Sequence, residues 1–546
     1  MKLDCDVMIV GGGPVGLYLA AELGKRGLSA HVFDNKSGTS THPAANANSA
    51  RTMEYFRRLG VADEIRSLGL PADHPTDVAY FTRLSTHELA RLPLPSAAQV
   101  RAGTGYHAFT WPTPEPLHRC SQLYVEPVLR RAAEASGQNR VWYNRTVTQI
   151  EQSATYVTVT SVDPGGKEYL GRARYAVGCD GPRSTIRSLL GLSYVGTAGE
   201  KRQFMGGRMA AAYFSAPTLS KVINGPPAWQ YWTLNNQQRA LIISVDGKGK
   251  YVINIQLQSH QEPSDFDVGQ RIANAVGENI PFELISNTAW TAGFALVSEK
   301  FHDRRVFLAG DAAHLFTPTG GLGYNTGIED AANLAWKLEA LVKGYGGPDL
   351  AESYEAERRP ASHRNTDFAR QFADSIGHVR LPANIEEEST AGELSRQAVG
   401  NYLFYHATKE FVIPGVQLGT RYENSPIVST EDGSPPPDTA NLYLPCGRPG
   451  HRAPHVWFSD GSSLYDHLSQ GFTLLALNAN ESATALTAHC LPQDIKQISI
   501  HSEEARDLYG ADYVLIRPDL HIAWRGNRLD NDLEVAIKRS LGNNGF

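Results

Sequence analysis

Two glycine-rich segments, each directly after a short apolar run, constrain this chain more than any other feature. The first is GGGPVG at residues 11–16, and the second lies within VFLAGDAAHLFTPTGGLGYNTGIED at residues 306–330. A glycine turn between a buried strand and a helix start is suited to an anionic group, because the free N–H groups of the helix N-terminus point at it. About 290 residues separate the segments, so we predict one site built from two distant parts of the chain.

The first segment has the full context of a dinucleotide-binding turn. Apolar runs at 5–10 and 29–33 predict buried parallel strands, and the Leu- and Ala-rich run at 17–24 predicts the helix between them. Strand, glycine turn, helix and strand together form a unit of the Rossmann type.

Each glycine of this turn has a separate expected role. Gly11 permits the tight turn, Gly13 lets the backbone approach a pyrophosphate, and Gly16 allows close packing of helix on strand. Asp34 follows Gly16 by 18 residues, close to the spacing of a carboxylate that accepts from ribose hydroxyls. The acid disfavours a 2′-phosphate, and a purely structural glycine turn is the alternative.

The second segment reads as the other part of the same site. A predicted strand at 306–309 ends in Gly310 and Asp311, where the aspartate can accept from a ribityl or ribose hydroxyl. A helix start rich in glycine follows, which suits an anionic or electron-rich group. Another predicted strand, at 175–179, ends in Asp180. Either strand end alone could be a simple turn, but the combination predicts a cofactor site.

With these motifs the chain resembles the FAD-dependent aromatic hydroxylases, the group that includes para-hydroxybenzoate hydroxylase and phenol hydroxylase. The resemblance also covers ARTMEYFRRLG at 50–60, CSQLYVEPVLRRAA at 120–133 and GCDGPRSTIR at 178–187. It implies FAD as the cofactor, with NADH or NADPH as a transient reductant and O2 as a co-substrate. The motifs and the resemblance together give the expected cofactor-binding residues: Gly11, Gly13, Pro14, Val15, Gly16, Asp34, Asn46, Arg51, Gln122, Asp180, Gly310, Asp311, Pro318, Gly321, Gly323, Tyr324 and Asn325.

One departure from the family pattern concerns an arginine that contacts FAD in many relatives. This chain reads HPAAN at 42–46, so Ala44 stands at the arginine's position. Either Asn46 and Asn48 replace it as hydrogen-bond donors, or Arg51 takes part of its role.

The domain organisation follows from the positions of the motifs. We expect an α/β protein whose Rossmann-like FAD-binding domain is discontinuous, with a mainly antiparallel substrate-binding sheet inserted and a C-terminal α/β domain that resembles the thioredoxin-like domain of the phenol hydroxylase branch. The expected bounds are 1–75, 115–190 and 299–400 for the FAD domain, 76–114 and 191–298 for the sheet domain, and 435–546 for the C-terminal domain.

The inserted region carries clustered aromatic residues of the kind that line apolar pockets with polar tips. The candidates for contact with a substrate are Tyr106, His107, Trp229 and Tyr231. His107 and Tyr231 are also the candidate catalytic groups, because either could deprotonate or hydrogen-bond a phenol. Plain core packing is the strong alternative for each of them.

The resemblance implies a monooxygenase that hydroxylates a phenolic or polycyclic aromatic substrate through a flavin C4a-hydroperoxide. No second GxGxxG with strand, helix and acid occurs, so a reduced pyridine nucleotide would have no Rossmann domain of its own. The alternatives are a flavin oxidoreductase that does not hydroxylate and a non-catalytic flavin-binding interaction protein.

Composition narrows the remaining classes. A net charge of −6 gives no basic footprint for nucleic acid or a membrane surface, and no apolar run approaches the ~18 residues of a bilayer span. Five scattered cysteines without CxxC spacing indicate neither a disulfide framework nor a metal site. We expect a cytoplasmic enzyme with a small aromatic substrate, and leave a homodimer open.

Overall fold

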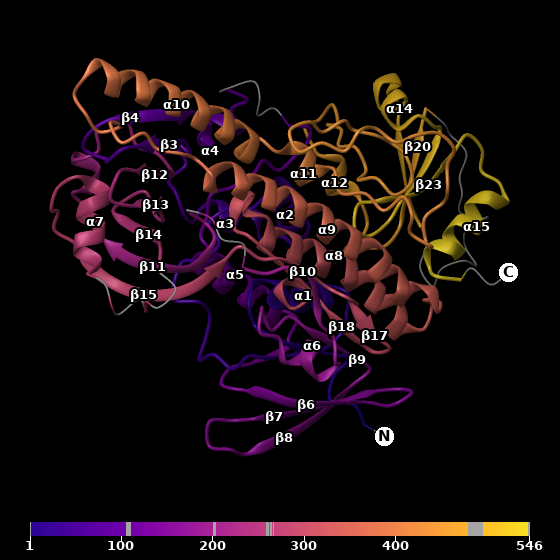
Figure 1. Ribbon diagram of the computed structural model, residues 1–546. Helices are drawn as coiled ribbons and strands as arrows, with labels where there is room; N and C mark the ends of the chain where they lie inside the picture. The colour runs from indigo at the N-terminus through magenta and orange to yellow at the C-terminus, as the bar shows by residue number, and fades with distance from the viewer. Residues whose placement is uncertain are drawn as a thin grey trace.

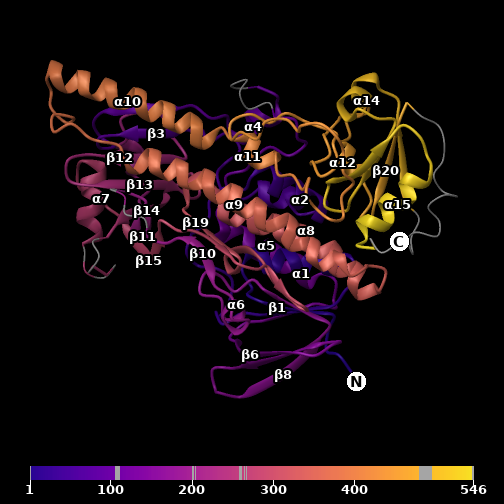
Figure 2. The same cartoon turned by 45° about the vertical axis from the view of Figure 1, so that its right-hand side comes forward.

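The structure is a computed structural model that describes residues 2–104, 111–199, 202, 204–257, 261, 262, 265, 267–478 and 495–543. Within this part of the chain, a parallel-sheet unit lies in the middle, a large sheet at one end and a smaller sheet unit at the other (Figure 1). The rotated view keeps this order, with the long helices α9 and α10 running along the top of the molecule (Figure 2). The bounds of α9 are Asp349–Gly377 and those of α10 are Thr390–Phe411.

The central sheet has the strand order β17-β18-β9-β1-β2-β5, and all neighbours are parallel except β17 and β18. Its strands are β17 (His302–Asp303), β18 (Val306–Leu308), β9 (Tyr175–Gly178), β1 (Val7–Val10), β2 (Ala30–Phe33) and β5 (Arg140–Trp142). The strands predicted before the glycine-rich segments are therefore confirmed. Because only β9 separates β1 from β18, the two distant segments meet at one sheet edge.

Helices cover this sheet and carry the predicted phosphate-binding turn. They are α1 (Pro14–Lys25), α5 (Gln122–Glu134) and α8 (Leu322–Lys343), and α1 packs against both of the others. The sheet core is apolar throughout, with each of the four residues of β1 buried, as expected for a parallel strand covered on both faces.

The large sheet has seven strands in the order β15-β11-β14-β13-β12-β3-β4, and it is antiparallel except for β12 beside β3. Its strands are β3 (Val78–Phe81), β4 (Glu88–Leu92), β11 (Gly207–Ser215), β12 (Gln230–Leu234), β13 (Arg239–Ser244), β14 (Lys250–Gln256) and β15 (Glu283–Ala292). One face packs against α7 (Val268–Val276). The other, which we call the inner face, packs against α9 and α10 and against residues of the cofactor unit. The mainly antiparallel sheet is thus as predicted.

Shorter elements connect these sheets. The antiparallel strands β6 (Thr146–Gln152), β7 (Val157–Val162) and β8 (Glu168–Ala173) form a small separate sheet, and β10 (Tyr194–Thr197), β16 (Ala295–Ser298) and β19 (His314–Phe316) form another. The short helices are α2 (Ala50–Leu59), α3 (Ala62–Arg66), α4 (Ala97–Arg101), α6 (Thr185–Leu189) and α11 (Pro414–Leu418).

Helix α10 changes one expected boundary. The end of the FAD domain was expected at residue 400, which lies inside α10. This helix packs along β4, and a Cβ on Gly400 would lie 2.1 Å from the carbonyl oxygen of Leu89. The helix therefore covers the inner face of the large sheet, and residues 390–411 belong with that layer.

The C-terminal unit contains a four-stranded sheet of order β21-β20-β22-β23, in which β20 is parallel to β21 and antiparallel to β22. Its elements are α12 (Leu464–His467), β20 (Thr473–Leu477), β21 (Lys496–Ile500), α14 (Glu503–Tyr509), β22 (Tyr513–Ile516), β23 (Ile522–Gly526) and α15 (Asn531–Ser540). The unit is α/β as expected, and its likeness to thioredoxin stays a prediction.

Buried charges join the C-terminal unit to the cofactor unit. Glu357 of α9 accepts two hydrogen bonds from the Arg517 guanidinium, at 2.6 and 2.8 Å, and one from Lys337 Nζ at 2.7 Å. Arg517 also donates to Asp519 at 2.6 Å, and the side chains of all four residues are fully buried. We call this group the Glu357 cluster. Burial opposes ionisation of Glu357, but Arg517 and Lys337 outweigh it and lower its pKa to about 2.

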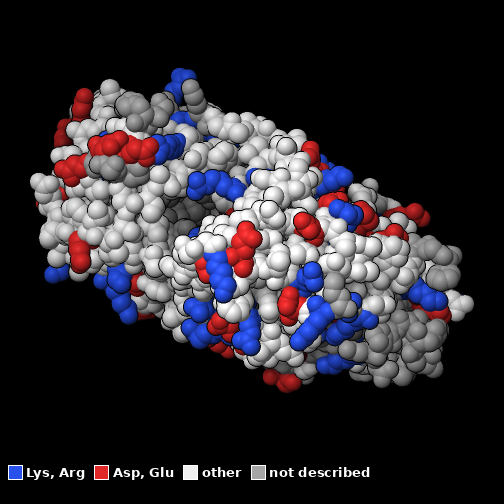
Figure 3. Space-filling model, turned by 90° about the horizontal axis from the view of Figure 1, so that it is seen from below, with Lys and Arg blue, Asp and Glu red and all other residues white. Residues whose placement is uncertain are grey.

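Within the part of the chain that the structure describes, none of the helices combines the length and apolar character that crossing a bilayer needs. On the face seen from below, acidic and basic side chains are interspersed, and this face is hollowed at one place (Figure 3).

Candidate functional site

The glycines of the first turn have different surroundings. A Cβ on Gly11, whose φ is +110°, would lie 2.1 Å from the carbonyl oxygen of Cys179, and one on Gly16 would lie 2.0 Å from that of Gly11. A Cβ on Gly13 would meet no described atom within 4 Å. Gly11 and Gly16 thus serve the packing of the protein, whereas Gly13 leaves open room above the N-terminus of α1, which a pyrophosphate can fill.

The carboxylate of Asp34 lies beside this open room. Its Oδ2 accepts the N–H of Gly12 at 2.6 Å and its Oδ1 accepts that of Lys36 at 2.8 Å. The two bonds fix the orientation of a largely buried acid at the end of β2. Pro14 and Val15 begin α1, with Pro14 at a position where a missing N–H is tolerated.

The second half of the site is held by a buried acid from α8. Gly310 N–H donates to Asp330 Oδ2 at 3.0 Å, and the same carboxylate binds His314 Nε2 at 2.6 Å and Arg358 Nε at 2.7 Å. Burial opposes ionisation of Asp330, but His314 and Arg358 outweigh it and lower its pKa. The turn that presents Asp311 is therefore fixed by an ionic contact on its buried side.

Asp311 itself keeps its surface open to solvent at the edge of the central sheet. Its exposed carboxylate can accept a hydrogen bond from a hydroxyl group of a bound ligand. Gly310, with φ +63°, packs on the side chain of Val15, and so joins the two glycine-rich segments directly.

The start of α8 is tied to the loop at 44–48. Asn325 Nδ2 donates to the carbonyl oxygen of Ala47 at 3.0 Å and its Oδ1 accepts the N–H of Ser49 at 2.8 Å. Tyr324 Oη donates to Asn48 Oδ1 at 3.0 Å. Tyr324 and Asn325 thus position the loop that follows Ala44, and their expected contact with the cofactor stays a prediction.

The same loop supplies a polar atom suited to a cofactor. Asn46 Nδ2 donates to the carbonyl oxygen of Ala44 at 2.9 Å, but its Oδ1 is buried and, within the described residues, has no hydrogen-bond partner. Gln122 joins this region from α5, because its backbone N–H donates to Ala45 at 2.7 Å, and its side chain reaches Glu126. Pro318, Gly321 and Gly323 line the start of α8 opposite this loop, and Gly321 lies near Ala47. A buried oxygen without a partner among the described residues fits a hydrogen-bond donor on a bound cofactor.

Asp180 lies at the end of β9 next to the first turn. Its carboxylate accepts from Ser184 Oγ at 2.6 Å and from the backbone N–H groups of Thr185 and Ile186 at 2.7 and 3.1 Å. Burial raises its pKa, while these hydrogen bonds oppose the rise. The residue is at the expected place, but its observed contacts hold the start of α6.

The cofactor role expected for Arg51 does not fit the structure. Its guanidinium donates to Glu54 at 2.9 Å and to the carbonyl oxygen of Asp519 at 2.9 Å, and it lies 4.5 Å from the ring centroid of Tyr55. Arg51 is buried between α2 and the C-terminal unit. The other alternative, in which Asn46 and Asn48 act as hydrogen-bond donors to the cofactor, stays a prediction. Asn46 Nδ2 donates to Ala44, and Asn48 Nδ2 donates to the carbonyl oxygens of His118 and Cys120.

The role expected for Tyr231 does not fit either. Its ring packs with Phe81 on the face that is covered by α7, and its hydroxyl accepts the N–H of Ala228 at 2.7 Å. Trp229 does lie with the inner-face residues, where its ring packs edge-on against Phe411 of α10. Tyr106 and His107 lie outside the described residues.

The inner face carries groups that the sequence did not single out. Tyr80 and Trp232 are register neighbours on β3 and β12, with ring centroids 5.9 Å apart. The loop at 44–48 and α5 pack against this face through Ala47 and Tyr124. His42 bridges the same loop to β15, with Nδ1 2.8 Å from Ser286 Oγ. The cofactor loop therefore rests on the inner face.

Comparison with known proteins agrees with this geometry. Residues 4–369 match a family model described as an FAD binding domain, and residues 447–544 match one described as aromatic-ring hydroxylase, C-terminal. The chain belongs to the FAD-binding aromatic-ring hydroxylases. The enzyme therefore binds FAD, and the turn at 11–16 and the segment at 310–325 both lie within the residues that match the FAD binding domain.

Relatives and solved structures cover almost the whole of this aromatic-ring hydroxylase. An FAD-dependent monooxygenase of Penicillium oxalicum is 32% identical over 88% of this chain and 95% of its own. The 2,4-dichlorophenol 6-monooxygenase of Delftia acidovorans is 28% identical over 99% of this chain and 98% of its own. The rebeccamycin biosynthetic enzyme RebC with reduced flavin has a TM-score of 0.88 and 33% identity, over 99% of both chains. Aklavinone-11 hydroxylase with FAD and aklavinone has a TM-score of 0.81 and 26% identity, over 99% of this chain and 100% of that one.

Proposed function

We propose that this protein uses NADH or NADPH together with O2 to hydroxylate a phenolic or polycyclic aromatic substrate. The observation that carries the proposal is that the cofactor loop at 44–48 packs on the aromatic inner face of the large sheet. A ligand between the two would lie against the cofactor and against Tyr80 and Trp232. An aromatic substrate is also supported by the names of two similar proteins, the 2,4-dichlorophenol 6-monooxygenase and aklavinone-11 hydroxylase.

FAD, when bound, supplies the electron transfer and the activation of oxygen. The chain's own residues bind and orient it. Gly13 and the N-terminus of α1 would hold the pyrophosphate, Asp34 the ribose and Asp311 the ribityl chain. Asn46 Oδ1 would accept a hydrogen bond from the cofactor, and the segment at 318–325 would flank the flavin ring. The apolar inner face would exclude water from the reacting groups.

Tyr80 is the group that we propose to hydrogen-bond the substrate, in the place expected for Tyr231. Its side chain is completely buried, and its hydroxyl has no hydrogen-bond partner among the described residues. An unpaired buried hydroxyl is costly unless a ligand satisfies it. Burial holds the pKa of Tyr80 well above its usual value. The group therefore stays protonated and can donate to a substrate oxygen.

We expect Tyr80→Phe to lower kcat/KM for the true substrate about tenfold to a hundredfold, corresponding to one lost hydrogen bond of about 1.5–3 kcal/mol. Tyr231→Phe is the matched control, because its hydroxyl contacts only backbone on the opposite face. The control is expected to keep kcat/KM while losing about 1 kcal/mol of stability. A reversed order of the two effects in steady-state assays would contradict the assignment of Tyr80.

The function is tested by following NADH and NADPH oxidation in air, with and without a panel of phenols and fused-ring phenols. Substrate-stimulated oxidation, with one atom of labelled O2 in the product by mass spectrometry, is the expected result. Stimulated oxidation without labelled product would favour the non-hydroxylating oxidoreductase. FAD that neither pyridine nucleotide reduces would favour the flavin-binding interaction protein. A cytoplasmic location and a homodimer stay predictions.

A further inference from the structure

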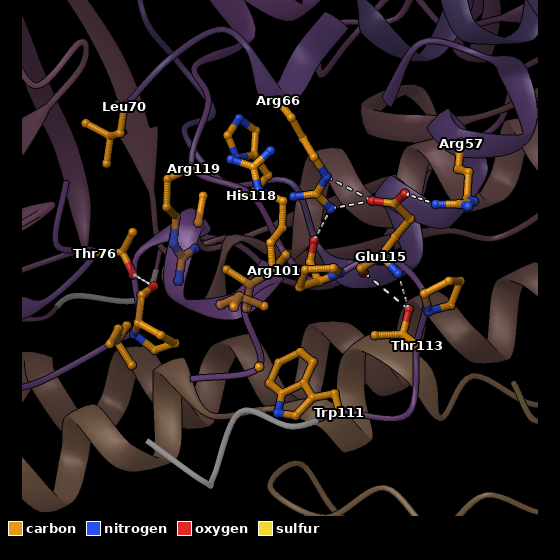
Figure 4. Close-up of a pocket in the computed structure, with 18 of the residues that line it drawn as sticks. Arg57, Arg66, Leu70, Thr76, Arg101, Trp111, Thr113, Glu115, His118 and Arg119 are labelled. Carbon is orange, nitrogen blue, oxygen red and sulfur yellow. Dashed lines mark hydrogen bonds and ion pairs between the residues drawn. The ribbon is translucent and has the colours of Figure 1, made fainter. Parts of the chain in front are cut away.

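A cavity of about 480 Å³ lies between α2, α4, the segment at 111–119 and Trp457 of the C-terminal unit. Its volume is in the range of small-molecule sites, about 300–1,000 Å³. Much of its wall is apolar, with Leu70, Leu94 and Trp111 among the lining residues (Figure 4). The cavity therefore has the size and the surface to take an aromatic ring system.

One wall of the cavity carries a buried arginine that has no anionic partner among the described residues. Arg119 is 8% exposed, and its Nε is buried without a hydrogen-bond partner among the described residues. Its guanidinium carbon lies 3.7 Å from the ring centroid of Trp229, on the inner face. In Figure 4 the side chain extends between Thr76 and Arg101. Burial lowers the pKa of Arg119 to about 9, and no carboxylate raises it again.

The other charges of the cavity wall do not compensate this arginine. The wall contains the cations Arg57, Arg66, Arg101 and Arg119 and the anions Asp63 and Glu115. Glu115 is already bound to Arg57 at 2.7 Å and to Arg66 at 2.5 Å. Within the described residues, the carboxylates that line the cavity do not reach Arg119, and Arg101 of α4 adds a second cation.

The wall that carries Arg119 adjoins the cofactor cradle. His118 and Asn48 exchange two backbone hydrogen bonds of 2.9 Å, so the segment at 117–119 runs beside the cofactor loop. Arg119 also meets the inner face through Trp229. The cavity wall therefore borders the cofactor loop through His118 and the inner face through Arg119.

From these contacts we propose that the substrate of this hydroxylase is an aromatic compound bearing a carboxylate, and that Arg119, assisted by Arg101, binds that carboxylate. The proposal rests on the proposed function and specifies its substrate class. A guanidinium fits a carboxylate in a two-bond geometry, and such a bond is strong in a desolvated site. The ring of Trp229 lies against one face of the Arg119 guanidinium. The N–H groups at the edge of the guanidinium can then bind the carboxylate.

A ligand-binding role makes an unusual prediction about stability. A buried arginine that held the fold together would destabilise the protein when it is replaced. Among the described residues Arg119 has no carboxylate partner, so the burial of its charge is a cost in the ligand-free protein that the contact with Trp229 offsets only in part. We expect Arg119→Met to unfold at the same or a higher temperature than the unaltered holoenzyme, measured by calorimetry without ligand. A fall of more than about 5 °C would assign the arginine a structural role and overturn the proposal.

The binding test compares aromatic carboxylates with their uncharged amides, using the holoenzyme and titration calorimetry. The probes are 2-naphthoate, 1-hydroxy-2-naphthoate and anthracene-2-carboxylate, each paired with its carboxamide. The unaltered protein is expected to bind at least one carboxylate at least tenfold more tightly than its amide. Arg119→Met is expected to abolish this preference, and Arg119→Lys to keep part of it. Arg208→Met, which removes one exposed cation paired with Glu262 on the large sheet, is the control and should retain the full preference.

Each outcome decides the proposal. A preference that depends on Arg119 supports it, whereas equal binding of acid and amide throughout the series, or a preference that survives in Arg119→Met, overturns it. Binding does not require turnover, so a protein that binds the acids but does not reduce FAD would contradict the hydroxylase function alone. If NADH or NADPH does reduce the bound FAD, but carboxylates that bind through Arg119 do not stimulate the oxidation of the pyridine nucleotide, the cavity is a non-substrate site and the substrate assignment is overturned.

Discussion

Gly13→Ala is expected to lower the affinity of the apoprotein for FAD at least about 100-fold, which corresponds to about 2.7 kcal/mol. The protein offers no obstacle to the new methyl group, because a Cβ at this position meets no described atom within 4 Å. The backbone at Gly13, with φ −77° and ψ −176°, is open to any residue. The methyl group would instead occupy the room in which a pyrophosphate must approach the N-terminus of α1. A fluorescence titration of apoprotein with FAD measures the effect.

The comparison that makes this result specific is Gly16→Ala in the same turn. A Cβ there would lie 2.0 Å from the carbonyl oxygen of Gly11, so this variant is expected to damage the fold itself. The apoprotein of Gly13→Ala should melt within a few degrees of the unaltered apoprotein, and that of Gly16→Ala far below it. If Gly13→Ala bound FAD normally, the pyrophosphate would have to lie elsewhere.

Glu357→Gln is expected to destabilise the protein by about 3–5 kcal/mol, because it removes a main counter-charge of Arg517 and Lys337 in a fully buried site. The structure gives the reason in distances, since three of the hydrogen bonds to this carboxylate from the two cations are between 2.6 and 2.8 Å. Glutamine keeps the shape but leaves the cations with less than their balance of negative charge. Urea unfolding of the FAD-loaded protein is the measurement.

Glu352→Gln, one turn earlier in α9, is the control. Its side chain is 71% exposed, so a change within about 0.5 kcal/mol is expected. Equal losses in the two variants would mean that the Glu357 cluster adds nothing specific to stability.

The same carboxylate has a pH signature. The pKa of Glu357 falls from 4.5 to about 2 on folding, so its contribution of about 3 kcal/mol is complete above pH ~4.5 and is lost as the pH falls through 2. The stability difference between the unaltered protein and Glu357→Gln should therefore shrink between pH 5 and pH 2. A difference that stayed constant over this range would show that the carboxylate does not titrate as proposed.

Local chemistry explains why the cofactor turns could be predicted from the sequence. The roles of Gly11 and Gly16 follow from contacts within a strand, a turn and a helix that are close in sequence. Asp34 is fixed by the length of the helix between two strands. Such features need no knowledge of the distant chain, so the strand, turn and helix could be predicted, whereas the contacts of these residues with FAD stay a prediction.

The face of the large sheet on which the Tyr231 side chain lies could not be predicted in this way. All five residues of β12 are buried, because both faces of the large sheet are covered. A strand buried on both faces shows no alternation of polar and apolar residues, so neighbours such as Tyr231 and Trp232 cannot be assigned to a face from the sequence. Only the register with Tyr80 on β3 reveals that Trp232 belongs to the inner face.

The prediction that Arg51 binds the cofactor failed for a different reason. A charged helix residue near a missing cofactor ligand suggests a substitute, yet its partners come from far along the chain. Glu54, to which it is bound, is also the partner of Arg452, 398 residues later. Contacts of this range are invisible in local patterns, and they determine that α2 faces the C-terminal unit.

The buried charges between the two units also limit how this protein can change in evolution. Glu357 and Lys337 belong to one unit, and Arg517 and Asp519 to the other, so loss of the C-terminal unit would remove the two hydrogen bonds from Arg517 to Glu357 and uncover the buried pair of Glu357 and Lys337. A chimera that takes its C-terminal unit from a relative would need matching residues at 54, 337 and 357. The two units are therefore expected to be inherited, exchanged and lost together.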